Sequence, residues 1–241
     1  MMDNKENGEQ KKWYQGISKY QWLVLLIASL GWVFDIFEGQ IFVASMRDAM
    51  PQLLNVGSAD NPEVASWSNY SFASFLLGGA FGGVLFGVMS DRIGRSKTLI
   101  FTILFYSVFT ALTALASEAW HMVVLRFLVA MGVGGEWAVA SAMVAEVMPK
   151  RSRAVMSSIF HASSVFGTLL AAAVGYFILA AKPWGESTWK LGFLIGILPA
   201  LLTLWIRWKL HEPERWKKAK DAEKKDESQA TGRLLEIFNK E

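Results

Sequence analysis

Long apolar segments limit what this chain can fold into. Six of them occur, near residues 20–46, 67–90, 98–117, 120–148, 154–181 and 189–210. A helix of roughly 20 mostly apolar residues crosses about 30 Å of hydrocarbon, so each segment is long enough to span a bilayer. A membrane barrel would instead need short strands of alternating polarity, which this sequence lacks. The sequence therefore predicts an all-α membrane protein with six transmembrane helices.

The basic residues predict how these helices are oriented. Lys and Arg concentrate before the first apolar segment, in the loops at 92–97 and 150–153, and after the sixth segment. By the positive-inside rule, both termini are expected to be cytoplasmic, in an integral multi-pass protein of the cell (inner) membrane. The expected organisation is a cytoplasmic segment at 1–19, a bundle at 20–210, and a cytoplasmic tail or central loop at 211–241.

Composition also excludes several classes of function. The net charge of +3 comes without an aromatic-interleaved basic patch, so nucleic-acid binding is not expected. The chain has no cysteine, which excludes disulfides and thiolate metal sites. We expect no metal and no cofactor. An intramembrane enzyme is disfavoured as well, because no nucleophile and base are suitably spaced.

Glycines in the second apolar segment recur at a spacing of four. They fall at positions 78 and 82 and at 79, 83 and 87, in the stretch "LLGGAFGGVLFG". Residues four apart share one helical face, and small residues let a neighbouring helix approach closely. We expect these glycines to pack against another helix and not to bind a ligand.

The segment "GVMSDRIGRSK" at 87–97 directly follows that helix. It resembles the signature loop of the major facilitator superfamily. Five residues carry the match: Gly87, Asp91, Arg92, Gly94 and Arg95. Ser96 departs from it, where family members often carry another base. The resemblance implies half of a twelve-helix fold, built from two inverted three-helix repeats, and a gating role for this loop. It extends to Glu146 and Arg153 as further gating residues, and to the segment "EPERW" at 212–216.

Two charges fall inside apolar segments, Asp35 in the first and Arg126 in the fourth. A charge at membrane depth is costly, so we expect these residues to face inward and pair. The alternative for Arg126 is that it snorkels to the external interface. In the proton-coupled sugar porters that this chain resembles, an acid and an Arg in these two helices form the protonation switch. The resemblance therefore implies that Asp35 and Arg126 couple transport to protons.

Other polar residues in the apolar segments are candidates for a substrate cavity: Glu38, Gln40, Glu136, Trp137, Ser141 and His161. Glu38 lies one turn beyond Asp35, on roughly the same helical face. For His161, a hydrogen-bonded packing role is favoured over a proton relay. None of the six belongs to a motif that assigns its role.

Within this superfamily, the chain resembles a narrower group, the sialate and lactate proton symporters. The match is carried by "GVGGEW" at 132–137 and by the stretch at 193–218. It implies secondary active transport of a small organic anion, such as a carboxylate or a sialate-like sugar acid, driven by protons. A neutral sugar or metabolite is the alternative substrate, and a non-transporting sensor or scaffold is the alternative function. The chain carries the features of an N-terminal half alone, so the expected partners are a missing C-terminal half or a second copy, the bilayer, protons and a small molecule.

Overall fold

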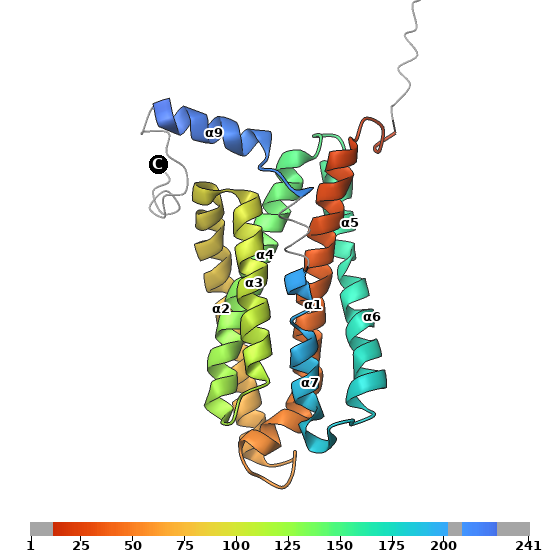
Figure 1. Cartoon of the computed structure of the whole chain (residues 1–241), viewed down its shortest axis with the longest axis vertical. Helices are drawn as coiled ribbons and strands as arrows, with labels where there is room; N and C mark the ends of the chain where they lie inside the picture. The colour runs from red at the N-terminus through yellow and green to blue at the C-terminus, as the bar shows by residue number, and fades with distance from the viewer. Residues whose placement is uncertain (1–11, 202–208, 226–241) are drawn as a thin grey trace, which may run out of the picture.

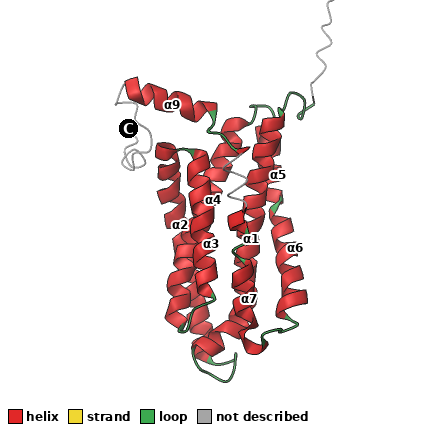
Figure 2. Ribbon diagram, viewed as in Figure 1, coloured by secondary structure: helices red, strands yellow, loops and turns green. Residues whose placement is uncertain are grey.

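The structure is a computed structural model that describes residues 12–201 and 209–225. Its described residues form helices and loops, with no strand among them (Figures 1 and 2). The long helices are α1 (Lys19–Leu53), α2 (Pro62–Ile93), α3 (Arg95–Thr113) and α4 (Ala119–Val147). The shorter ones are α5 (Arg153–Ala162), α6 (Ser164–Val174), η1 (Gly175–Leu179), η2 (Gly185–Ser187), α7 (Thr188–Ile195) and α9 (Glu214–Lys225).

Five stretches of the described chain are long and apolar enough to cross a membrane. They are α1 to α4 and the stretch Arg153–Leu179, in which α5, α6 and the π-helical turn η1 follow one another. These five coincide with the first five predicted segments. The sixth, at 189–210, overlaps α7 and includes a short helical piece at 199–201. Its residues 202–208, among them Trp205 and Trp208, which are expected at a membrane interface, lie outside the described residues.

Helix α1 extends further than the sequence predicted. Its start is fixed by a capping box, in which the Ser18 hydroxyl accepts from the Gln21 N–H and the Gln21 side chain accepts from the Ser18 N–H. The stretch 47–66 between the first two apolar segments contains Pro51, Gly57 and Pro62, which break helical periodicity and predict a loop there, but α1 continues through Pro51. The reason is burial: Ala49, Met50 and Leu53 join an apolar cluster with residues of α4 and α7. The true loop is 54–61, and Asn61 caps α2 with Pro62 at its first position.

The glycines of α2 pack directly against α4. A methyl group added at Gly78 would overlap the backbone of Phe127, and one added at Gly82 would overlap the backbone of Met131. In return, a methyl group at Gly134 of α4 would overlap Gly79. The predicted packing role is therefore confirmed for Gly78 and Gly82, where the backbones of α2 and α4 approach too closely for any larger side chain, whereas a methyl group at Gly87 would meet no other atoms.

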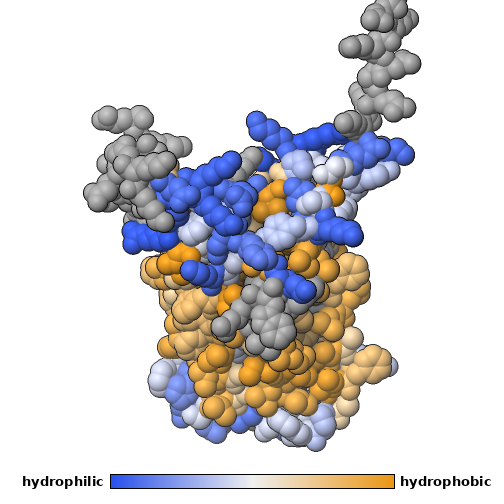
Figure 3. All heavy atoms as spheres, turned by 45° about the horizontal axis from the view of Figure 1, so that its top comes forward, coloured by the Kyte–Doolittle hydropathy of each residue, from blue (hydrophilic) through white to orange (hydrophobic). Residues whose placement is uncertain are grey.

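The surface of the bundle is divided into bands (Figure 3). A broad hydrophobic belt lies between polar residues at the two ends of the molecule. Large apolar side chains are exposed on the outer helices, among them Leu76, Leu77 and Phe81 of α2 and Phe166 and Leu169 of α6. The end that carries α9 and the loops at 92–97 and 148–153 is called the basic end below (Figure 1).

Candidate functional site

Arg126 of α4 is enclosed in the middle of the bundle. Its Nη1 donates to Glu38 of α1 at very short range, and the two side chains are 0% and 1% exposed. The Nη2 donates to the Thr113 hydroxyl at 2.6 Å, and Thr110 donates to the same Glu38 oxygen at 3.2 Å. The guanidinium also lies over the aromatic rings of Phe42 and Phe193, 5.1 Å and 4.9 Å from their centroids.

This geometry agrees with the expectation that Arg126 faces inward and corrects the expectation about its partner. The side chain does not snorkel to an interface, because no part of it is exposed. Its partner is Glu38 and not Asp35. The reason is the antiparallel register of α1 and α4. Gln21 Nε2 near the start of α1 donates to the carbonyl of Val147 at the end of α4, at 2.8 Å. An α-helix rises about 1.5 Å per residue, so Glu38 lies about 4.5 Å further along α1 than Asp35. It is therefore the nearer of the two acids to the level of Arg126, within reach of that long side chain.

A second buried cluster lies one turn before Glu38 along α1. In this cluster, Asp35 of α1, Glu136 of α4 and Tyr106 of α3 interact electrostatically. They are 3%, 1% and 0% exposed. Glu136 reaches α1 because Gly31 has no side chain: its carboxyl oxygen Oε1 occupies the place where a Gly31 Cβ would lie. Both Asp35 oxygens, Glu136 Oε2 and the Tyr106 hydroxyl have no hydrogen-bond partner among the described residues.

Tyr106 was not among the residues singled out from the sequence, although a signal for it exists. Hydroxyl side chains recur along α3 with helical spacing and are all buried on one face: Thr98, Thr102, Tyr106, Thr110 and Thr113. In an apolar helix, such a stripe indicates a face turned toward polar groups of neighbouring helices. Two of these residues contact the Glu38–Arg126 pair, and Tyr106 contacts the second cluster.

Trp137 of α4 and His161 of α5 are exposed and lie together with Trp32 of α1. The ring centroids are 6.4 Å apart for the two tryptophans and 6.3 Å apart for Trp137 and His161. Trp32 Nε1 donates to the His161 carbonyl at 3.3 Å, and the His161 ring nitrogen Nδ1 lies 2.8 Å from the Ser157 carbonyl. Three helices therefore present one aromatic surface, and Trp32 was missing from the sequence-based candidates.

The remaining cavity candidates are not gathered at one place. Gln40 is exposed on α1, and Ser141 donates to the Ala138 carbonyl of its own helix at 3.1 Å. Glu38 and Glu136 are buried in the two clusters described above. In the part of the chain that the structure describes, no group of three or more His, Cys, Asp or Glu side chains is placed to hold a metal ion.

At the basic end, Arg95 connects three segments. Its Nη1 contacts Asp91 at 2.5 Å and donates to the Ser90 hydroxyl at 2.6 Å, and its Nη2 contacts Glu146 of α4 at 2.8 Å. Arg92 is exposed, and a methyl group at Gly87 would meet no other atoms. Of the predicted gating residues, Asp91, Arg95 and Glu146 are thus brought together. Arg153, the first residue of α5, has side-chain nitrogens without hydrogen-bond partners among the described residues.

The segment before α9 attaches to the same loop. The carboxylate of Glu212 accepts from the backbone N–H groups of Ser96 at 3.2 Å and Lys97 at 3.4 Å, in the first turn of α3. Gly94 precedes that turn with φ +113°, and a Cβ there would collide with Glu212. Trp216 of α9 donates from Nε1 to the Asp91 carbonyl at 2.9 Å. The segment that follows the sixth predicted span is thereby held against the loop between α2 and α3.

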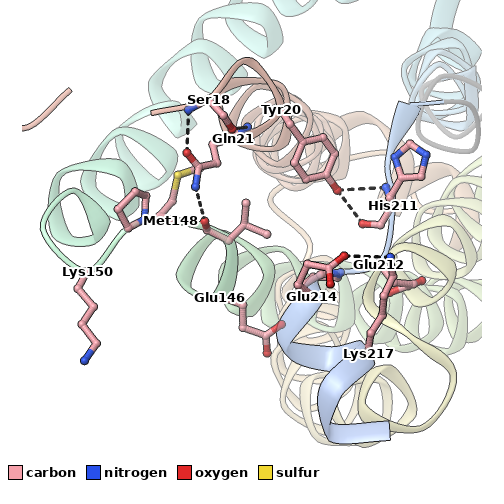
Figure 4. A pocket seen from close by; sticks show the side chains of 13 residues that line it. Ser18, Tyr20, Gln21, Glu146, Met148, Lys150, His211, Glu212, Glu214 and Lys217 are labelled. Atoms are coloured by element: carbon pink, nitrogen blue, oxygen red, sulfur yellow. Dashed lines mark hydrogen bonds and ion pairs between the residues drawn. The ribbon is translucent and has the colours of Figure 1, made fainter. Parts of the chain in front are cut away.

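A pocket of about 630 Å³ opens beside this attachment. Figure 4 shows Tyr20 pointing toward His211 across from Gln21 and Met148. The Tyr20 hydroxyl donates to the His211 carbonyl at 2.7 Å and accepts from its N–H at 3.1 Å. The pocket is lined by the start of α1, the end of α4 and residues 211–217, so it belongs to the basic end and is separate from both buried clusters.

Paired helices with buried charges at membrane depth, and a charged loop network at one end, define one half of a multi-pass membrane transporter fold. Residues 21–236 match the family model described as "Sugar (and other) transporter". The chain belongs to this family of the major facilitator superfamily and is an integral membrane protein.

Named relatives agree with this membership. The chain is 31% identical over 208 residues to the sialic acid transporter NanX of Escherichia coli, covering 85% of this chain and 47% of the relative. It is 29% identical over 198 residues to the gentisate transporter of Corynebacterium glutamicum, covering 81% of this chain and 42% of the relative. A partially occluded inward-open structure of the xylose transporter XylE from E. coli superposes with a TM-score of 0.74 at 24% identity, over 92% of this chain and 54% of that one.

The chain spans about half the length of the curated relatives that it matches. The all-helical fold predicted from the sequence is confirmed by the described helices and by the similarity to XylE.

Proposed function

We propose that the complete protein is a secondary active transporter, in which protons moving down their gradient carry a small organic anion across the membrane by alternating access. The observation that carries this proposal is the pair of buried charge clusters on α1 and α4. Charges at membrane depth are expensive, and in membrane proteins they mark ion or proton pathways. In this proposal, Asp35 carries the proton, while Arg126 fixes Glu38 in the bundle beside it.

The preference for an organic anion is supported by the relatives, two of which transport sialic acid and gentisate. The aromatic surface of Trp32, Trp137 and His161 adds a place where a planar or apolar part of a substrate can pack.

A neutral sugar or metabolite is the second candidate, because one observation favours it. Arg126 is already paired with Glu38, so this ion pair gives no net attraction to an anion. The positive charge that an anion requires would then come from another part of the complete protein.

Gating in this proposal takes place at the basic end, which is cytoplasmic by the positive-inside rule. The contacts of Arg95 with Asp91 and Glu146, and of Glu212 with the start of α3, hold that end closed. Opening toward the cytoplasm breaks them. Gly87, Arg92, Gly94 and Arg153 are the other residues to which this proposal assigns a gating role.

The complete protein needs a second six-helix body. Alternating access moves two bodies about a central site, and this chain supplies one of them. A C-terminal half of the same protein is the first candidate for the other body, and a second copy of this chain is the alternative.

The test is uptake into liposomes that contain the complete protein isolated from its native membrane. Labelled sialic acid, lactate and xylose are supplied separately, with and without a pH gradient directed inward. We expect one of the two acids to accumulate above its external concentration, and a protonophore to abolish the accumulation. Accumulation of xylose alone would identify the neutral-sugar alternative. No flux of any probe, in exchange or under a gradient, would refute the transporter assignment.

A further inference from the structure

We infer that Asp35 and Glu136 together form the proton-carrying site of the complete transporter, and that Tyr106 is the hydroxyl group through which they exchange the proton. This inference rests on the proposed function, and it replaces a single carboxyl with a pair contributed by two helices. It also removes Arg126 from the protonation step, in contrast to the pairing of Asp35 with Arg126 that the sequence suggested.

The first argument is placement. Glu136 lies more than two turns beyond Arg126 on α4, and its carboxyl group is directed at α1, into the space left by Gly31. Asp35 follows Gly31 by one turn on the same helix, so both acids enter one buried space between α1 and α4. Gly132 of α4 gives similar room to Tyr106, whose Cβ would lie 2.7 Å from a Cβ at that glycine. Glycines on both helices thus make room for this cluster.

The second argument is charge. The titratable or charged groups facing Asp35 are Glu38 on its own helix, Glu136 on α4 and Tyr106 on α3. Arg126, the nearby cation of α4, donates instead to Glu38 and Thr113. Two ionised carboxylates in such a space would face each other without a compensating cation. A buried carboxylate without a partner is expensive, and a proton is the smallest ligand that removes the charge.

The third argument is the set of unpartnered oxygens. Tyr106 is fully buried, and its hydroxyl interacts with Asp35 and Glu136, although no hydrogen bond of ordinary geometry joins these groups. A buried hydroxyl normally makes a well-formed hydrogen bond, and its absence beside two acids is explained by a role in proton transfer between them. Asp35 Oδ1 and Oδ2 and Glu136 Oε2 likewise lack a hydrogen bond of ordinary geometry. These are the atoms that a mobile proton would connect.

The proton step balances without any other reactant. When Asp35 is protonated and Glu136 is not, the Asp35 proton moves to the Tyr106 oxygen, while the Tyr106 O–H proton moves to a Glu136 oxygen. The hydroxyl is restored, Asp35 becomes ionised, and Glu136 becomes neutral. In each transport cycle the pair gains one proton from water on one side and releases one proton to water on the other side.

The experiment compares exchange with uphill uptake in liposomes containing the complete protein. The probe is whichever of labelled sialic acid, lactate or xylose the unmodified protein exchanges. Variants are Asp35→Asn, Glu136→Gln and Tyr106→Phe, with exposed residues of α2 as matched controls, Glu63→Gln and Tyr70→Phe. A pH-sensitive dye inside the liposomes reports the protons that enter with the probe.

We expect Glu136→Gln to keep exchange while losing accumulation and proton entry, as Asp35→Asn does. Tyr106→Phe should slow proton-driven uptake by roughly a hundredfold or more, the range of a lost proton-transfer group, with exchange retained. The two controls should behave as the unmodified protein. If Glu136→Gln does not fold, Tyr106→Phe decides the matter, because retention of full proton-driven uptake in that variant would overturn the inference.

The outcomes distinguish a failure of the transporter assignment from a failure of the inference about Asp35, Glu136 and Tyr106. If the unmodified protein exchanges none of the probes, the transporter assignment fails, and this inference fails with it. If the unmodified protein accumulates a probe with protons and Glu136→Gln does the same, this inference alone is overturned. Accumulation that follows a sodium gradient at constant pH would also overturn it, because the acids would then bind a metal cation.

Discussion

Asp35 and Glu38 lie three residues apart on α1, and both are buried, yet their surroundings differ. Glu38 has a cation and a hydroxyl donor in Arg126 and Thr110. Asp35 has a second acid and a tyrosine beside it, and neither of its oxygens has a hydrogen-bond partner among the described residues. The comparison shows how the register between two antiparallel helices gives neighbouring acids different environments. One acid is held in an ion pair, and the other is an acid to which we assign the transported proton.

Among the variants that test this comparison, Arg126→Gln should have the largest effect, a loss of stability. Removing one partner of a buried ion pair leaves the other charge uncompensated, which costs about 3–5 kcal/mol. We expect that loss in the free energy of unfolding of the complete protein in lipid or mild detergent. Adding Glu38→Gln should recover most of it, because the unpaired charge is then gone. A stability unchanged by Arg126→Gln would show that the ion pair does not support the fold.

Asp35→Asn should have the next largest effect, and it should change transport without destabilising the protein. Proton-driven accumulation in liposomes should be abolished, while exchange of the same substrate continues. The free energy of unfolding should stay equal or rise, because an unpaired acid is replaced by a neutral amide of the same size. Unchanged accumulation would remove Asp35 from the coupling mechanism.

A smaller effect is expected from Gly31→Ala, which tests how the second cluster is assembled. The new methyl group would displace the Glu136 carboxyl group, and such overpacking costs about 1–3 kcal/mol. Proton-driven uptake should fall with it. The matched control is Gly39→Ala in the same helix, where a methyl group meets no other atoms within 4 Å. Equal losses of uptake in the two variants would argue against a specific contact between Gly31 and Glu136.

A small effect on stability is expected from Asp91→Asn at the basic end. The Asp91 side chain is 36% exposed, and ion pairs open to solvent contribute about 0–1 kcal/mol. We expect slower interconversion between the two access states, measured as a lower transport rate at saturating substrate, with unchanged substrate affinity. A loss of substrate binding would mean that this loop acts at the substrate site.

The helices themselves could be predicted from the sequence, because membrane-spanning segments must be long, apolar and internally hydrogen-bonded. The glycine spacing of α2 likewise predicted its close packing against a neighbouring helix. The predicted end of α1 was wrong. Pro51 predicts a break in the helix, but burial of Met50 and Leu53 outweighs it, and that burial depends on contacts with α4 and α7.

The candidate site was predicted in part. The residue types at membrane depth, Asp35, Glu38, Arg126 and Glu136, were identified because charges stand out in apolar segments. Their pairing was not, because it depends on the register between α1 and α4, which a shift of one helical turn would change. Tyr106 and Trp32 were missed because a hydroxyl or an indole in an apolar helix is ordinary until a neighbouring helix shows what it faces.

The most direct test of the difference between the two acids is infrared spectroscopy of the complete protein in lipid, which detects the carbonyl stretch of protonated carboxyl groups. The account predicts a protonated-carboxyl band that changes when substrate and pH change. The band should be lost or reduced in Asp35→Asn and in Glu136→Gln, and kept in the double variant Glu38→Gln with Arg126→Gln. A band that disappears in the Glu38 double variant and persists in both others would contradict the account, because the proton would then belong to the ion pair.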